Sequence, residues 1–176
     1  MEFTLGGHTA SVNVVKWGGA DVLYTASSDR TVRVWYTKQG KPLHTLKDHA
    51  HWVTTLALNT DFILCTGPYD HTGKKPASDE DGQSPSLLSS KQVHQPHPSN
   101  TAQKLAQTRY TTLLRTSPTE LLISGSDDHT LFLWSPLSST KPIARLTGHQ
   151  RQVFYVSFSL DGRWSASAAW DNSVRV

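Results

Sequence analysis

Ser124-Gly-Ser-Asp-Asp-His-Thr-Leu-Phe-Leu-Trp134 has the pattern of a β-hairpin. An apolar run at residues 121–123 leads into it, and Asp127-Asp-His129 supplies residue types that favour a tight turn. From Thr130 onward the residues return to types that strands favour. The stretch therefore predicts two antiparallel strands joined by a short turn.

The same pattern occurs at residues 25–35 and, cut short, at 167–176. In the alignment of the three copies, an aspartate occupies each turn, and a hydroxyl residue stands four positions before it. In the first two copies a tryptophan stands six positions after the aspartate. A third tryptophan is expected directly after Val176, so we expect the chain to be a fragment that stops inside a strand.

A histidine precedes each hairpin, in Gly7-His8, Asp48-His49 and Gly148-His149, and a valine four residues later opens an alternating strand. The first histidine lies 21 positions before its turn aspartate, and the third lies 22 positions before its own. This nearly constant spacing indicates one structural unit repeated along the chain.

The repeated unit resembles that of the WD-repeat family, which runs from a Gly-His pair to a Trp-Asp pair and forms one four-stranded blade of a β-propeller. Asp48 replaces the glycine of the second Gly-His pair, and Tyr36 and Ser135 replace the aspartate after tryptophan. The resemblance implies an all-β partial propeller of about three four-stranded blades, the last one truncated, with one long insertion that contains a short helix.

The second unit is interrupted, because 79 positions separate His49 from Asp128. A rival register, with Thr66 and Asp70 in place of Ser124 and Asp128, would make residues 62–66 a strand. We favour residues 121–126, since proline stands at position 76 where the rival register needs tryptophan.

The expected organisation has three parts. Residues 1–67 form blade 1 and the start of blade 2, residues 68–115 form the insertion, and residues 116–176 complete blade 2 and give a truncated blade 3. Within the insertion, the polar composition of residues 68–102 predicts a disordered loop. Apolar residues from Leu105 to Leu114 recur at helical spacing and predict a short amphipathic helix that docks on the propeller's rim.

The histidine, hydroxyl, aspartate and tryptophan side chains of each unit suggest a catalytic triad at first sight. A triad needs one constellation open to substrate, whereas this one recurs from unit to unit. The family resemblance implies structural tetrads instead, in which tryptophan donates to the hydroxyl, the hydroxyl to histidine, and histidine to aspartate. We therefore expect no catalytic residues and no enzyme activity. The tetrad residues are His8, Thr25, Asp29 and Trp35; His49, Ser124, Asp128 and Trp134; and His149, Ser167 and Asp171.

Composition narrows the remaining classes. No apolar run reaches membrane-spanning length, and none follows Met1 as a signal peptide requires. The single cysteine, Cys65, fits a reducing intracellular compartment. The net charge of +3 is spread along the chain and predicts no strong nucleic-acid patch. His94 and His97 lack the cysteine or carboxylate neighbours of a metal site, so we expect no metal, cofactor or small-molecule substrate.

Six positions are candidates for partner binding, because propellers bind through the loops where the first strand of a blade begins and the second ends. They are Ser11, Trp52 and Gln152, each three residues after a tetrad histidine, and Ser28, Asp127 and Trp170, each directly before a turn aspartate. The two tryptophans are the strongest candidates, since exposed tryptophan is enriched at binding hot spots. Partial burial of either ring between blades is the alternative.

Within the family, the resemblance narrows to ribosome-assembly factors on residues 49–58, 124–136 and 141–150. It implies a non-catalytic scaffold of large (60S) subunit assembly in the nucleus and nucleolus, which binds pre-60S proteins or rRNA, with a further link to Notch signalling. The resemblance also implies contact with the AAA ATPase midasin, but that contact would need an N-terminal domain that residues 1–176 do not include. The alternative is a generic WD-repeat adaptor, either a ubiquitin-ligase substrate receptor or a signalling scaffold.

Overall fold

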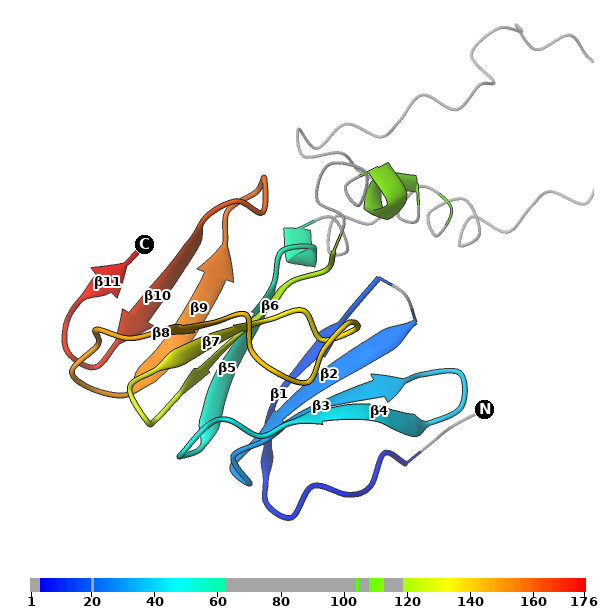
Figure 1. Ribbon diagram of the computed structural model, residues 1–176, viewed down its shortest axis with the longest axis horizontal. Coiled ribbons are helices and arrows are strands. Elements are labelled where there is room, and N and C mark those ends of the chain that lie inside the picture. Colours follow the sequence, from blue (N-terminus) through cyan, green and yellow to red (C-terminus); the bar gives the residue numbers. More distant parts are fainter. Residues whose placement is uncertain (1–3, 20, 63–103, 105–107, 113–118) are drawn as a thin grey trace, which may run out of the picture.

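Three antiparallel sheets make up the structure, a computed structural model that describes residues 4–19, 21–62, 104, 108–112 and 119–176 (Figure 1). The first blade comprises β1 (Val12–Trp17), β2 (Val22–Ser27), β3 (Val32–Tyr36) and β4 (Lys41–Leu46), paired in that order. The second comprises β5 (Val53–Leu58), β6 (Leu122–Ser126), β7 (Leu131–Trp134) and β8 (Ala144–Leu146), also in order. The third comprises β9 (Val153–Phe158), β10 (Ser165–Ala169) and β11 (Val174–Arg175).

The predicted fold class, a partial propeller of about three blades, is confirmed by this arrangement. The first two blades have four strands and the third has three. Residues 108–112 are helical and fall within the helix expected in the insertion. The loop expected at residues 68–102 lies outside the described residues.

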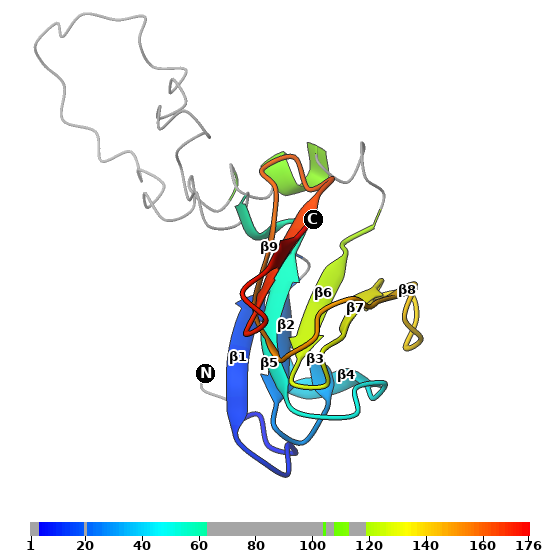
Figure 2. The same ribbon diagram turned by 90° about the vertical axis from the view of Figure 1, so that its left-hand side faces the viewer.

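The three sheets pack face to face, and β1, β5 and β9 lie side by side (Figures 1 and 2). All six residues of β2 and all five of β6 are buried. This burial explains why neither strand alternates between apolar and charged residues, since a sheet covered on both faces has no solvent-facing side.

One core lies between the first and second blades, and a second core lies between the second and third. Tyr24, Val34, Leu58 and Trp134 contribute to the first, and each is at most 1% exposed. Ile123, Val153 and Val156 contribute to the second. Burial of each such aliphatic side chain stabilises the fold by about 1.5–3 kcal/mol.

The favoured register of the interrupted unit is the one that the structure adopts. β5 pairs with β6 from Val53↔Ser126 to Leu58↔Leu122, although 63 residues separate the two strands in sequence. Residues 61 and 62 are helical rather than extended, and residues 63–66 of the rival strand lie outside the described residues. The insertion therefore joins two neighbouring strands at one end of the second blade.

A β-bulge interrupts the pairing near the start of the first strand of each blade, at Val12/Val14, at Val53/Thr55 and opposite Ala168/Ala169. A bulge re-aims the extra side chain. In the first blade, Asn13 Nδ2 donates to the carbonyl oxygen of Val53 at 2.8 Å. In the second, Thr54 Oγ1 donates to the carbonyl oxygen of Val153 at 2.5 Å. The bulges of the first two blades thus each link their blade to the next one.

Candidate functional site: the tetrads and the rim

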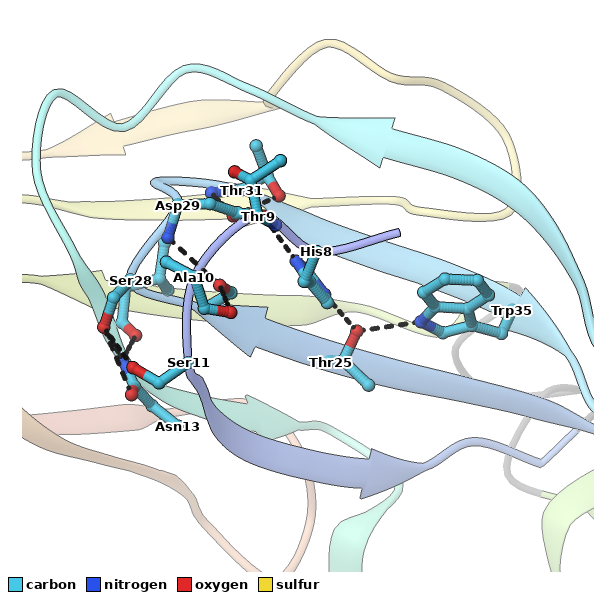
Figure 3. Close-up of polar contacts among 12 residues, drawn as sticks. His8, Thr9, Ala10, Ser11, Asn13, Thr25, Ser28, Asp29, Thr31 and Trp35 are labelled. Atoms are coloured by element: carbon cyan, nitrogen blue, oxygen red, sulfur yellow. Dashed lines mark hydrogen bonds and ion pairs between the residues drawn. The ribbon is translucent and has the colours of Figure 1, made fainter. Parts of the chain in front are cut away.

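The first tetrad is an unbroken chain of hydrogen bonds from the core to the surface (Figure 3). Trp35 Nε1 donates to Thr25 Oγ1 at 2.8 Å, and Thr25 Oγ1 lies 2.7 Å from His8 Nε2. His8 Nδ1 lies 2.7 Å from Asp29 Oδ2. Because a carboxylate only accepts, the network places the imidazole proton on Nδ1, and Nε2 accepts from the threonine hydroxyl. Every polar atom in the chain then has a partner.

The second tetrad repeats this geometry across the interruption. Trp134 Nε1 donates to Ser124 Oγ at 2.8 Å, and Ser124 Oγ lies 2.7 Å from His49 Nε2. His49 Nδ1 lies 3.0 Å from Asp128 Oδ2. The insertion therefore leaves the tetrad of its blade intact.

In the third blade, His149 lies 2.9 Å from both Ser167 Oγ and Asp171 Oδ2. His149 and Ser167 line a cleft of about 490 Å³, together with Arg145, Arg175 and Val176 among others. By register, this cleft lies where the tryptophan rings lie in the first two blades. The cleft therefore belongs to the tetrad geometry and is not a separate site.

Each turn aspartate also closes its own hairpin. Asp29 Oδ1 accepts from the backbone nitrogen and the hydroxyl of Thr31, at 3.0 and 2.6 Å, and Oδ2 accepts from the backbone nitrogen of Thr9 at 3.1 Å. The residue after each aspartate has a positive φ, 69° at Arg30, 67° at His129 and 61° at Asn172. The aspartate's bonds stabilise a backbone conformation that is uncommon for residues other than glycine.

These bonds also set the charge state of the aspartates. Burial by itself would raise the pKa of Asp29 and of Asp128, but the hydrogen bonds of the turn and of the histidine outweigh it and hold both pKa values well below their usual range. At Asp171 the hydrogen bond from Ser173 is the largest cause of a lowered pKa. The three carboxylates therefore stay ionised at neutral pH and accept hydrogen bonds.

The six rim candidates meet in pairs at one end of the blades. The backbone nitrogen of Ser28 donates to the backbone oxygen of Ser11 at 2.9 Å. In the same way Asp127 donates to Trp52 at 3.0 Å, and Trp170 donates to Gln152 at 3.0 Å. Trp52 and Trp170 are 52% and 65% exposed, so neither ring is buried between blades in this chain.

The rim changes character from blade to blade. In the first blade the Ser28 hydroxyl hydrogen bonds to both Ser11 and Asn13. In the third, the rings of Phe154 and Trp170 lie 5.2 Å apart, and Phe154 is 47% exposed. Between them, the ring of His51 lies 5.2 Å from that of Trp52. We call Trp52, Phe154 and Trp170, with His51, the aromatic rim patch.

Phe154 was not among the residues singled out in the sequence. It occupies the bulge position five residues after His149, where the other two units carry Asn13 and Thr54. An apolar aromatic residue at a position that is polar in its sister repeats is the signal that could have identified it. An exposed aromatic pair in this position suits contact with another molecule.

Two further absences apply to the described part of the chain. Its helices are all too short to cross a membrane. Its histidine, cysteine and acidic side chains nowhere gather in groups of three that could hold a metal ion. His94 and His97 lie outside the described residues.

Stacked antiparallel blades that each contain a His-hydroxyl-Asp network define a repeat protein of the WD type. The "WD domain, G-beta repeat" family matches residues 1–36, 112–135 and 140–176, and the chain therefore belongs to the WD40 repeat family.

Particular relatives are more informative still. The chain is 45% identical over 176 residues to Ribosome assembly protein 4 of Saccharomyces cerevisiae, covering 99% of the chain and 31% of that protein. It is 40% identical over 157 residues to Protein Notchless of Drosophila melanogaster, covering 89% and 29%. It is 45% identical over 172 residues to the Notchless protein homolog of Arabidopsis thaliana, covering 98% and 32%. The chain thus spans about a third of the length of these relatives, and the predicted likeness to ribosome-assembly members of the family is confirmed.

Proposed function

We propose that this chain is part of the propeller of a non-catalytic scaffold that acts in ribosome assembly, docking on a precursor of the large subunit in the nucleus and nucleolus. The observation that carries the proposal is the 40–45% identity to a ribosome assembly protein and to Notchless proteins over nearly the whole chain. A generic adaptor role has no comparable support from relatives of this similarity.

The geometry supports a scaffold rather than an enzyme. The histidine, hydroxyl and aspartate groups satisfy one another in a pattern repeated in each blade, and the aspartate carboxylates are occupied by turn donors. A nucleophilic serine or threonine would need a position beside it for substrate. In the first two blades that position holds the tryptophan ring.

We further propose that the aromatic rim patch contacts the precursor particle. The exposed aromatic area of the patch lies beside the carboxylate of Asp127, whose Oδ2 lies 3.7 Å from His51 Nδ1. An acidic group beside the patch disfavours the phosphate backbone of RNA, since nucleic-acid affinity depends mainly on cationic side chains. The contact is therefore with a protein component of the particle.

The test is co-sedimentation of the full-length protein with precursor particles. Trp170→Ala should weaken binding by about 2 kcal/mol or more, as is typical of hot spots, and should change the free energy of unfolding by less than about 1 kcal/mol. Trp164→Ala is the matched control, because Trp164 is 66% exposed but lies in the β9–β10 connection at the opposite end of the blades. Equal binding by Trp170→Ala and Trp164→Ala would show that the aromatic rim patch does not contact the particle.

A further inference from the structure

A buried carboxylate that the tetrads do not use lies at the end of the blades opposite the rim. Glu120, 3% exposed, precedes β6. Its Oε1 accepts from the Tyr24 hydroxyl at 2.5 Å. Its Oε2 accepts from the Gly19 backbone nitrogen at 3.0 Å and from Thr60 Oγ1 at 3.3 Å. The Tyr110 hydroxyl donates to the same carboxylate.

These four donors come from three separate parts of the chain. Gly19 and Tyr24 belong to the first blade, Thr60 follows β5 in the second, and Tyr110 belongs to the helical residues 108–112 of the insertion. A buried carboxylate is costly unless donors surround it. Glu120 meets that requirement only when all three parts are assembled, so its hydrogen bonds couple their positions.

The shape of the site fits this coupling. Tyr110 is only 6% exposed, and its ring packs directly on Gly19, where a side chain on the backbone would overlap it. A side chain at Gly18 would come within 2.7 Å of both Glu120 Oε1 and the Tyr24 ring. Gly19 thus leaves room for the Tyr110 ring, and Gly18 leaves room for the Glu120 carboxylate and the Tyr24 ring beside it.

The electrostatics keep the donors in place. Burial, and then the nearby Glu120 charge, raise the pKa of both Tyr24 and Tyr110 well above that of a free phenol. Both hydroxyls therefore remain protonated across the physiological pH range and continue to donate.

We propose that Tyr110 and Glu120 form a latch that seats the insertion's helix on the seam between the first and second blades. The latch makes Glu120 a positioning residue. It holds the exposed side chains of Thr111 and Thr112 at a defined place on the end of the blades opposite the aromatic rim patch. The protein then presents two separate surfaces, one on the rim and one carried by the insertion.

The test measures a distance within the full-length protein. Nitroxide labels are placed at Thr112→Cys on the helix and at Lys41→Cys on the exposed strand β4, in a background where Cys65 and any further cysteines are replaced by serine. We expect pulsed electron paramagnetic resonance to give one narrow distribution of distances between the two labels. Tyr110→Ala should broaden it at least twofold, and the control Tyr155→Ala, at a tyrosine 59% exposed on β9, should leave it narrow.

Glu120→Gln separates the latch from a merely structural role, because the amide nitrogen cannot accept the bonds that the carboxylate oxygen accepts. A broader distribution of label-to-label distances in this variant supports the latch. A lowered melting temperature with an unchanged narrow distance overturns it, as does a broad distance in the parent protein. If Tyr110→Ala does not fold, Tyr110→Phe replaces it, and an unchanged width there also overturns the proposal.

Discussion

At the scale of single residues, each turn aspartate holds two structures together. Asp128 accepts from His49, which closes the tetrad, and from Thr130 and the backbone of Ala50, which close the turn. The side chain of His49 is 2% exposed, so loss of its acceptor leaves a buried hydrogen-bond donor unpaired. The spacing of the repeats was sufficient to name these residues, because each tetrad follows the same register.

Replacement of Asp128 should therefore destabilise the protein. We expect Asp128→Ala to lower the free energy of unfolding of the full-length protein by about 1–3 kcal/mol, the usual cost of leaving a buried polar group unpaired. Asp127→Ala, one residue away on the rim, is the control and should cost less than about 0.5 kcal/mol. Denaturant unfolding of both variants gives the comparison, and equal losses would contradict the tetrad's structural role.

The lowered pKa values of Asp29 and Asp128 predict acid sensitivity. A carboxylate whose folded pKa lies below its unfolded value contributes stability that is fully present above the unfolded value, about 3.9, and is lost as the pH falls toward the folded one. The free energy of unfolding should thus decrease as the pH drops below about 4. Asp128→Asn should show a shallower decrease in denaturant titrations at successive pH values, and an identical slope would exclude Asp128 as a contributor.

Two residues were not predicted from sequence, for different physical reasons. Glu120 acts through Tyr24, 96 positions away, and through Tyr110 in the insertion. Nothing in its local sequence marks it as buried. Phe154 looks like an ordinary strand residue until the bulge turns it outward beside Trp170.

At the scale of elements, the valine four residues after each histidine was predicted to open a strand, and β1, β5 and β9 begin at Val12, Val53 and Val153. β8 is the short last strand of the second blade, where only Ala144–Leu146 pairs. It is hydrogen-bonded on one side alone, so its pairing depends on β7 and not on its own sequence. The role of the bulges in joining the blades depends on contacts between repeats, which the sequence of a single repeat does not show.

The bulge hydrogen bonds give a prediction about blade stacking. Thr54→Val keeps the shape of the side chain but removes the donor to the carbonyl oxygen of Val153. We expect the free energy of unfolding of the full-length protein to fall by about 1 kcal/mol, the net worth of one hydrogen bond. The exposed Thr147→Val is the control and should stay within about 0.5 kcal/mol. An equally small effect of both would show that the bulges do not hold neighbouring blades together.

At the scale of the whole molecule, the outer faces of the stack remain apolar. Val15 and Trp17 on β1 are 53% and 62% exposed, and Tyr155 on β9 and Val174 on β11 are 59% and 69% exposed. In a repeat protein each unit gains stability from its neighbours, and terminal units normally carry a polar outer face. The first and third blades have a neighbour on one side only in this chain, so the cooperative core is confined to the two interfaces around the second blade.

The 176-residue chain should therefore not unfold in one cooperative step when it is expressed alone. We expect a broad thermal transition, in which the outer blades lose structure before the second blade, because uncovered sheet edges and faces contribute little to a shared core. Calorimetry should give a van't Hoff enthalpy well below the calorimetric one, the mark of a transition that is not two-state. Sedimentation measured alongside establishes that the chain is monomeric, and a sharp two-state transition of that monomer would show that three blades suffice for a cooperative fold.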